Sequence, residues 1–259
     1  GVGQGKGFET EIKYDKSFSK DLSLQVNGTF TYATARYKKF EEPDYSDVPW
    51  KSRVGLKLSQ PFGLIAERLF IDDEDVSNSP RQLFGEYGAG DIKYKDINGD
   101  NQIDANDQVP IGYPTTPEII FGTGFTAQYK SFDLSLFFQG SGRSSFFISP
   151  ADISPFLNRG QRALLQYIAD DHWSEENKDI NAFWPRLSEY TISNNNQAST
   201  HWLRNGSFVR LKSGEFGYSL PQRWIQRARV NRFRFYVSGT NLLLWSKFKM
   251  WDPEMAGRG

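Results

Sequence analysis

Regular alternation of apolar and polar side chains limits what this chain can fold into. In residues 22–32, LSLQVNGTFTY, the even positions carry Leu22, Leu24, Val26, Gly28, Phe30 and Tyr32, and the odd positions carry Ser, Gln, Asn and Thr. Successive side chains of a β-strand point to opposite faces, so this pattern predicts a strand with one apolar and one polar face. Residues 8–18 alternate in the same way, and the short link at 19–21 predicts a hairpin.

Six further segments predict strands, with varying regularity: 50–58, 63–70, 119–129, 132–140, 207–220 and 230–239. The segment 207–220 changes face around Gly214, which predicts a β-bulge. Residues 158–173 instead place Ala163, Leu164, Tyr167 and Ile168 at helical spacing, and predict a short helix in a loop.

The connections between these strands alternate in length. Links at 19–21, 60–62 and 130–131 are short, whereas those at 38–49, 71–117 and 141–206 are long. In an outer-membrane β-barrel, short turns lie at the periplasmic end and long loops lie outside the cell. A soluble β-sandwich can also be aromatic and alternating, but it has no reason to keep its long loops at one end. The pattern therefore favours an all-β, antiparallel transmembrane barrel.

Composition excludes several other classes of protein. The 259 residues carry no net charge, which gives no basic surface for nucleic acid, and they include no cysteine for disulfides or thiolate metal sites. Only His172 and His201 are histidines, and no nucleophile elbow, zinc motif or P-loop is present. Carboxylates are numerous, but their spacing selects no catalytic pair. We therefore expect no enzyme.

One loop has the spacing of a calcium site. Numbered from Asp96, the ligand positions 1, 3, 5, 7, 9 and 12 of such a loop are Asp96, Asn98, Asp100, Gln102, Asp104 and Asp107. Position 6 is Asn101 instead of glycine, and position 12 is aspartate instead of glutamate. The flanks are not helical, so this is no helix-loop-helix sensor. The alternative is an Asx-rich turn held by its own hydrogen bonds, and calcium is predicted as a structural ion only.

Several stretches, in order, resemble SusC/RagA-type TonB-dependent outer-membrane transporters. These are GKGFETEIKY, PFGLIAERLF, GDIKYKDINGDNQIDANDQVPIG, GFTAQYKSFDLSLFFQGSGR, HWSEEN with WPR, STHWLRNGSFVRLKSGEFGYSLP, RFYVSGTNLLLWSK and DPE. They cover nearly the whole chain. The resemblance implies that residues 1–259 are the C-terminal portion of a plugged barrel of about 22 strands, without the plug or the terminal strands.

The resemblance also implies a function and partners. The function is import of an oligosaccharide or a peptide across the Gram-negative outer membrane, driven by TonB acting on the plug, together with a SusD-like surface lipoprotein. Leu24, Val26 and Phe30 are then expected to face lipid, and Gln25, Asn27, Thr29 and Thr31 to line the wet interior. Two alternatives stay open: a secreted, calcium-stabilised, carbohydrate-binding β-sandwich, and an extracellular hydrolase.

Overall fold

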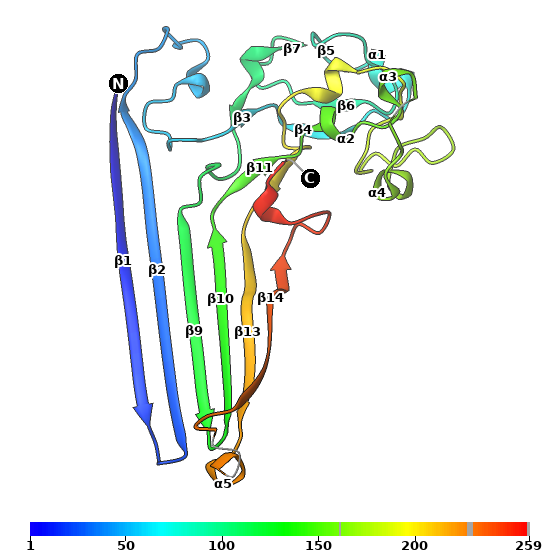
Figure 1. Cartoon of the computed structure of the whole chain (residues 1–259). Helices are drawn as coiled ribbons and strands as arrows, with labels where there is room; N and C mark the ends of the chain where they lie inside the picture. Colours follow the sequence, from blue (N-terminus) through cyan, green and yellow to red (C-terminus); the bar gives the residue numbers. More distant parts are fainter. Residues whose placement is uncertain (161, 227–229, 258–259) are drawn as a thin grey trace.

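The computed structural model describes residues 1–160, 162–226 and 230–257. Six long strands form one antiparallel sheet in the order β1-β2-β9-β10-β13-β14, in which every strand pairs with its neighbour along the chain (Figure 1). Their bounds are Val2–Ser17 (β1), Leu22–Lys39 (β2), Ile119–Tyr129 (β9), Phe132–Gly142 (β10), Phe208–Ser219 (β13) and Arg234–Ser246 (β14). The prediction of these six strands is confirmed.

The short connections lie at one end of the sheet and the long connections at the other. One end carries the tight turns at 18–21 and 130–131 and a longer link containing α5 (Gln222–Ile225). The other end carries the long connections 40–118 and 143–207 and the segment that follows β14 (Figure 1). The long connections gather at one end, as the alternation in length predicts for a barrel wall. We refer to residues 40–118, 143–207 and 247–257 as the loop domain.

Two predicted strands are not part of the sheet. Residues 50–58 overlap a 3-10 turn (η1, Pro49–Lys51) and contain a left-handed Gly55. Only residues 55–58 lie against β2, through a bridge between Arg36 and Lys57 and a few backbone hydrogen bonds beside it. Residues 63–70 contribute only two short strands, β3 (Phe62–Gly63) and β4 (Ala66–Leu69). Leu64, Leu69 and Phe70 of this second segment are fully buried, and a core that encloses a segment from several sides needs no alternation. The first large loop therefore spans 40–118, and not only 71–117.

The loop domain is built from short elements. Its helical turns are α1 (Asp73–Ser77), η2 (Ala105–Asp107), α2 (Pro150–Ile153), α3 (Leu157–Gly160), α4 (Gln166–Asp170), η3 (Ser193–Asn196) and η5 (Pro253–Met255). Its other strands are β5 (Arg81–Gln82), β6 (Ile92–Tyr94), β7 (Gln102–Ile103), β8 (Val109–Pro110), β11 (Ser145–Phe147) and β12 (Leu203–Asn205). The helix predicted over 158–173 is instead two short turns, α3 and α4, and residue 161 between them lies outside the described residues. Among the described helices, none has the length and apolar character needed to cross a membrane.

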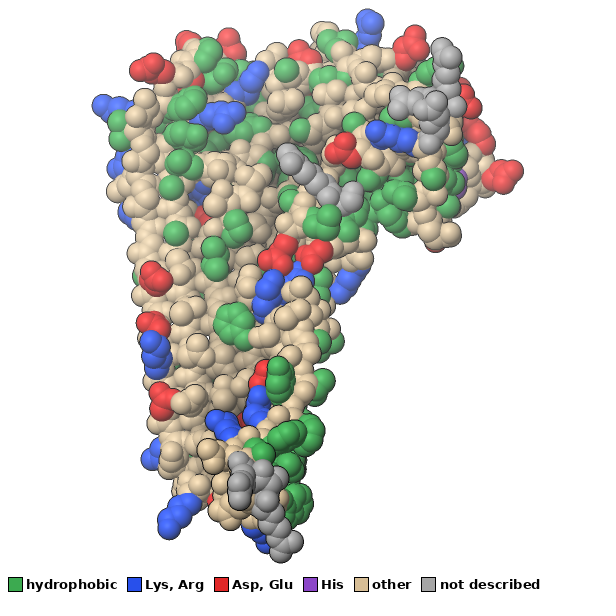
Figure 2. All heavy atoms as spheres, viewed as in Figure 1, with side chains coloured by type: hydrophobic (Ala, Val, Ile, Leu, Met, Phe, Trp, Pro, Cys, Tyr) green, Lys and Arg blue, Asp and Glu red, His purple; other side chains and the backbone are tan. Residues whose placement is uncertain are grey.

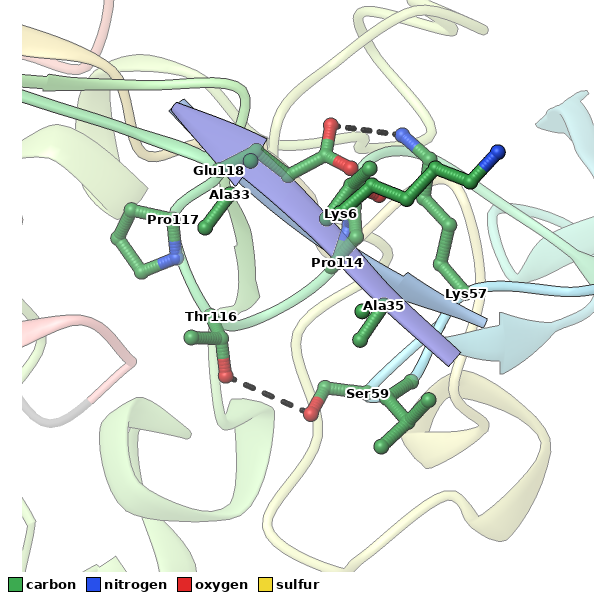
Figure 3. A pocket seen from close by; sticks show the side chains of 13 residues that line it. Lys6, Ala33, Ala35, Lys57, Ser59, Pro114, Thr116, Pro117 and Glu118 are labelled. Carbon is green, nitrogen blue, oxygen red and sulfur yellow. Dashed lines mark hydrogen bonds and ion pairs between the residues drawn. The ribbon is translucent and has the colours of Figure 1, made fainter. Parts of the chain in front are cut away.

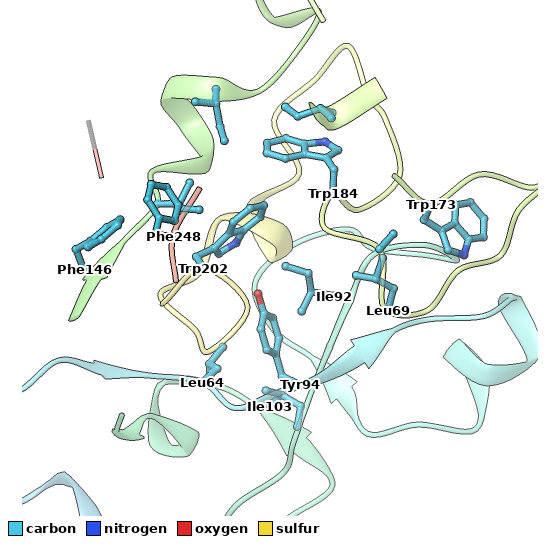
Figure 4. Packing of buried hydrophobic residues seen from close by; sticks show 14 residues of the cluster. Leu64, Leu69, Ile92, Tyr94, Ile103, Phe146, Trp173, Trp184, Trp202 and Phe248 are labelled. Atoms are coloured by element: carbon cyan, nitrogen blue, oxygen red, sulfur yellow. The ribbon is translucent and has the colours of Figure 1, made fainter. Parts of the chain in front are cut away.

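A shared hydrophobic core holds the loop domain together (Figure 4). Side chains from both long connections meet in it, and Phe248 joins them from the segment after β14. The fully or almost fully buried members include Leu64, Leu69, Ile92, Tyr94, Ile103, Ile148, Ile168 and Trp202. Because chain segments far apart in sequence supply one core, the loops form an ordered body at the end of the sheet and not a set of independent connections.

Candidate functional site: two faces of a barrel wall

Register places apolar side chains from all six strands on one face of the sheet. Tyr14 pairs with Val26, Val26 with Phe125, and Phe125 with Leu136, so these side chains project to the same side. We call this side the apolar face; it also carries Phe8, Ile12, Leu24, Phe30, Leu134, Phe216 and Val237. Phe8, Ile12 and Val237 are more than half exposed, although they are large and apolar.

No second sheet covers the apolar face in the part of the chain that the structure describes, since the other sheets are two-stranded elements of the loop domain. The β-sandwich alternative is therefore wrong, because its large apolar side chains would be buried between two layers. An extended apolar surface of this kind requires a nonaqueous neighbour, and lipid supplies one along a barrel wall.

The opposite side, the polar face, carries hydroxyl, amide and charged side chains. Gln25 pairs with Thr126 and Thr126 with Ser135, while Asn27, Thr29 and Thr31 follow on the same side of β2. Figure 2 shows the strands from a side on which few hydrophobic side chains appear. The predicted separation of Leu24, Val26 and Phe30 from Gln25, Asn27, Thr29 and Thr31 onto opposite faces is confirmed.

Charged groups on the polar face neutralise each other across three strands. Arg234 of β14 forms ion pairs with Asp133 of β10 and with Glu215 of β13, the latter at 2.6 Å. Gly217 makes room for them, because a Cβ there would lie 2.3 Å from the Arg234 guanidinium. The sequence did not reveal this cluster, because its members are far apart along the chain and become neighbours only through strand register.

A hollow of about 490 Å³ lies where β1 and β2 meet the loop domain (Figure 3). Lys6 and small residues of the two strands line it, together with Leu58, Ser59, Thr116 and Pro117. Beside it, the almost fully buried Glu118 pairs with Lys57 at 2.7 Å and with Arg143 at 3.1 Å. These two cations hold the start of β9 against both long connections, so Glu118 ties the sheet to the loop domain.

The aspartate loop is closed by side chain to backbone hydrogen bonds. Asp96 accepts from the backbone N–H groups of Gly99 and Asn101, at 2.7 and 2.8 Å, and Asn101 has the left-handed φ of 66°. Asp107 is buried and accepts from the N–H groups of Ile97 and Asp104, both at 2.8 Å. Asn98, Asp100 and Asp104 each accept from the N–H two residues ahead, whereas Gln102 is exposed in β7.

These bonds are those of the Asx-rich turn. In the described ranges, no three His, Cys, Asp or Glu side chains are grouped closely enough to hold a metal ion. Calcium binding by this loop stays a prediction. If calcium holds the loop, adding it to the chelated full-length protein will raise the temperature at which protease cleaves between 96 and 107. An unchanged cleavage temperature would favour the Asx-rich turn alone.

His201 gives the loop domain a pH-dependent stability. Its Nε2 lies 2.9 Å from the carbonyl oxygen of Phe183, and since a carbonyl only accepts, Nε2 carries the proton of the neutral ring. Burial lowers the pKa of His201 to about 4. The folded pKa lies below the unfolded value of about 6.5, so the neutral ring stabilises the fold above that pH, and this stability is lost as pH falls toward 4.

We expect the loop domain to lose about 1 to 3 kcal/mol of stability between pH 6.5 and pH 4 through this group. The measurement is the temperature of proteolytic opening of the loops, taken at several pH values. His201→Gln keeps a hydrogen-bond donor but does not titrate. In this variant the opening temperature will therefore change less between pH 6.5 and pH 4. An unchanged slope in His201→Gln would show that other groups are responsible.

The apolar face leads to a prediction for Val26, which lies in β2 opposite Tyr14 and Phe125. Val26→Arg will cost about 2 to 4 kcal/mol if the position lies near the bilayer midplane. Thr29→Arg, on the polar face of the same strand, is the matched control and will fold and insert as the parent does. Urea unfolding of the full-length protein in lipid vesicles measures the difference. Equal stability of the two variants would overturn the assignment of faces.

Comparisons with known proteins agree with this geometry. No protein-family model matches the chain. The chain is 34% identical over 171 residues to TonB-dependent receptor P26 of Formosa agariphila, a match covering 66% of the chain and 17% of the relative. It is 27% identical over 265 residues to TonB-dependent receptor P3 of the same organism, covering 97% of the chain and 25% of the relative. The chain thus spans a quarter or less of the length of these relatives.

Solved structures give the same fold. The RagAB peptide transporter matches with a TM-score of 0.69 at 19% identity, over 99% of this chain and 27% of that chain. The open-open state of the RagAB peptide importer matches with a TM-score of 0.68 at 20% identity, with the same coverage. At such identities the likeness establishes the fold.

A single antiparallel sheet with one apolar face, one polar face and all long loops at one end is a segment of a transmembrane β-barrel wall. Its similarity to TonB-dependent receptors in sequence, and to RagAB in fold, confirms the resemblance carried by the motifs. By these likenesses the chain resembles a SusC/RagA-type TonB-dependent transporter.

Proposed function

We propose that the protein containing this chain imports an oligosaccharide or a peptide across the outer membrane. The observation that carries the proposal is the sorting of side chains over six strands, because an exposed apolar face and a continuous polar face suit a wall between lipid and a wet lumen. The relatives are named as receptors and transporters, which supports transport without chemistry on the substrate.

The proposed partners follow from the same placement. TonB would supply energy through a plug, and a SusD-like lipoprotein would meet the loop domain outside the cell. The loop domain is suited to such contact because its shared core makes it one ordered body at one end of the wall. If calcium orders residues 96–107, it would stiffen this surface further and take no part in transport.

Uptake by intact cells tests the proposal. Cells that express the full-length protein are given fluorescently labelled oligosaccharides and peptides, with and without a protonophore. We expect one class to accumulate, to require the proton-motive force and to disappear when the gene is deleted. Uptake that survives the protonophore would exclude energy coupling through TonB, and recovery of the protein in buffer without detergent would exclude the membrane placement.

A further inference from the structure

The alternation of side chains continues past the end of β14 into the loop domain. Phe248 is buried there, with ring centroids 5.1 Å from Phe146 and 4.8 Å from Trp251, and Met250 packs on the same core. The intervening Lys247 and Lys249 are exposed. One side of this segment therefore anchors the loop domain, while the two lysines remain beside Trp245 at the upper edge of the sheet.

These lysines border a hollow of about 440 Å³, which we call the edge hollow. Phe121, Val209 and Trp245 line it from three strands of the apolar face, and its other lining residues are Phe208 and serine residues 141, 207 and 246. Gly140 shapes it, because a Cβ there would lie 2.3 Å from Cζ of Phe121 and would displace that ring. Trp245 pairs with Val209 and is half exposed.

Charge distinguishes the edge hollow from the neighbouring part of the same edge. Lys57 and Arg143 both pair with Glu118. Lys247 and Lys249 form no ion pair with any residue that the structure describes, and no acidic residue lines the edge hollow. Two free cations above an apolar recess form a surface that is complementary to an anion carried on a hydrocarbon chain.

We infer that the edge hollow binds a lipid with a phosphate headgroup. The acyl chain would lie on Phe121, Val209 and Trp245, and the ammonium groups of Lys247 and Lys249 would donate to the phosphate oxygens. Tryptophan at this level suits the boundary between hydrocarbon and headgroups, and basic pockets at membrane edges bind anionic headgroups. The inference rests on the proposed membrane placement, but it adds a specific ligand.

Native mass spectrometry of the full-length protein in detergent micelles tests the inference. The probes are dioctanoyl phosphatidic acid and the diacylglycerol with the same chains. We expect about thirtyfold tighter binding of the phosphatidic acid, from two lysines at the headgroup level. In the double variant Lys247→Gln with Lys249→Gln, the phosphatidic acid and the diacylglycerol will bind with nearly equal affinity. Lys16→Gln with Lys20→Gln, two exposed lysines at the opposite end of the sheet, will leave the preference intact.

Each other outcome has a definite meaning. An undiminished preference in the Lys247 and Lys249 variant overturns the inference, as does equal binding of both probes by the parent protein. Full competition by millimolar inorganic phosphate would identify a site for free phosphate and exclude the lipid. A parent protein that needs detergent but shows no preference refutes the edge hollow alone, whereas a protein that is soluble without detergent refutes the membrane placement itself.

Discussion

Trp202→Ala is expected to open the loop domain and leave the barrel wall intact. Trp202 is 1% exposed, and its indole N–H donates to the carbonyl oxygen of Asn195 at 2.6 Å. Its ring lies 5.2 Å from that of Trp184 and 6.0 Å from that of Phe183, so truncation leaves a large cavity in the shared core of the loop domain. Such a substitution costs about 3 to 5 kcal/mol.

Limited proteolysis of the full-length protein in detergent measures this loss, because cleavage follows the population of the opened loops. We expect the loops of Trp202→Ala to be cleaved at least a hundredfold faster, with strand fragments of the barrel still protected. Trp224→Ala removes an equally large side chain that is 58% exposed on α5, and will leave loop cleavage unchanged. Equal cleavage of both variants would show that the shared core does not hold the loops.

Strand alternation in the sequence predicted the barrel wall because the two faces of each strand contact different environments, one apolar and one aqueous. That requirement acts on every residue of a long strand, so it is visible in segments such as 22–32 without knowledge of their partners. It also assigned faces correctly, since register keeps Val26 aligned with Tyr14 and Phe125. The wall is the part of this fold that local pattern determines.

The loop domain could not be predicted in this way. Its strands are two to four residues long, which is too short for a period to appear. Residues 50–58 mimic a strand by composition, but only 55–58 lie against β2, after the 3-10 turn and the left-handed Gly55. The ion pairs of Glu118 and Arg234 likewise join positions that no local spacing connects. Long-range packing decides all of these features.

The second large effect is expected at Gln82, whose side chain lies in a buried network of hydrogen bonds. Gln82 is 2% exposed; its amide nitrogen donates to the carbonyl oxygen of Ile92 and to Asn194 Oδ1, at 2.9 and 2.7 Å. Its amide oxygen accepts from the backbone N–H of Tyr94 at 2.7 Å. One side chain therefore joins β5 to β6 and to the second long connection, across 112 residues of sequence.

Gln82→Leu has nearly the same volume but cannot form these bonds, so it will leave the Tyr94 N–H and the Asn194 amide oxygen buried without their partner. At about 1 to 3 kcal/mol for each such group, we expect a loss of about 4 kcal/mol. Gln102→Leu, an exposed substitution in the adjacent strand β7, is the matched control and will change little. The readout is urea-dependent opening of the loops by proteolysis. Because hydrophobic burial is retained in Gln82→Leu, a loss in this variant alone would show that hydrogen bonding, in addition to core packing, joins the two long connections into one body.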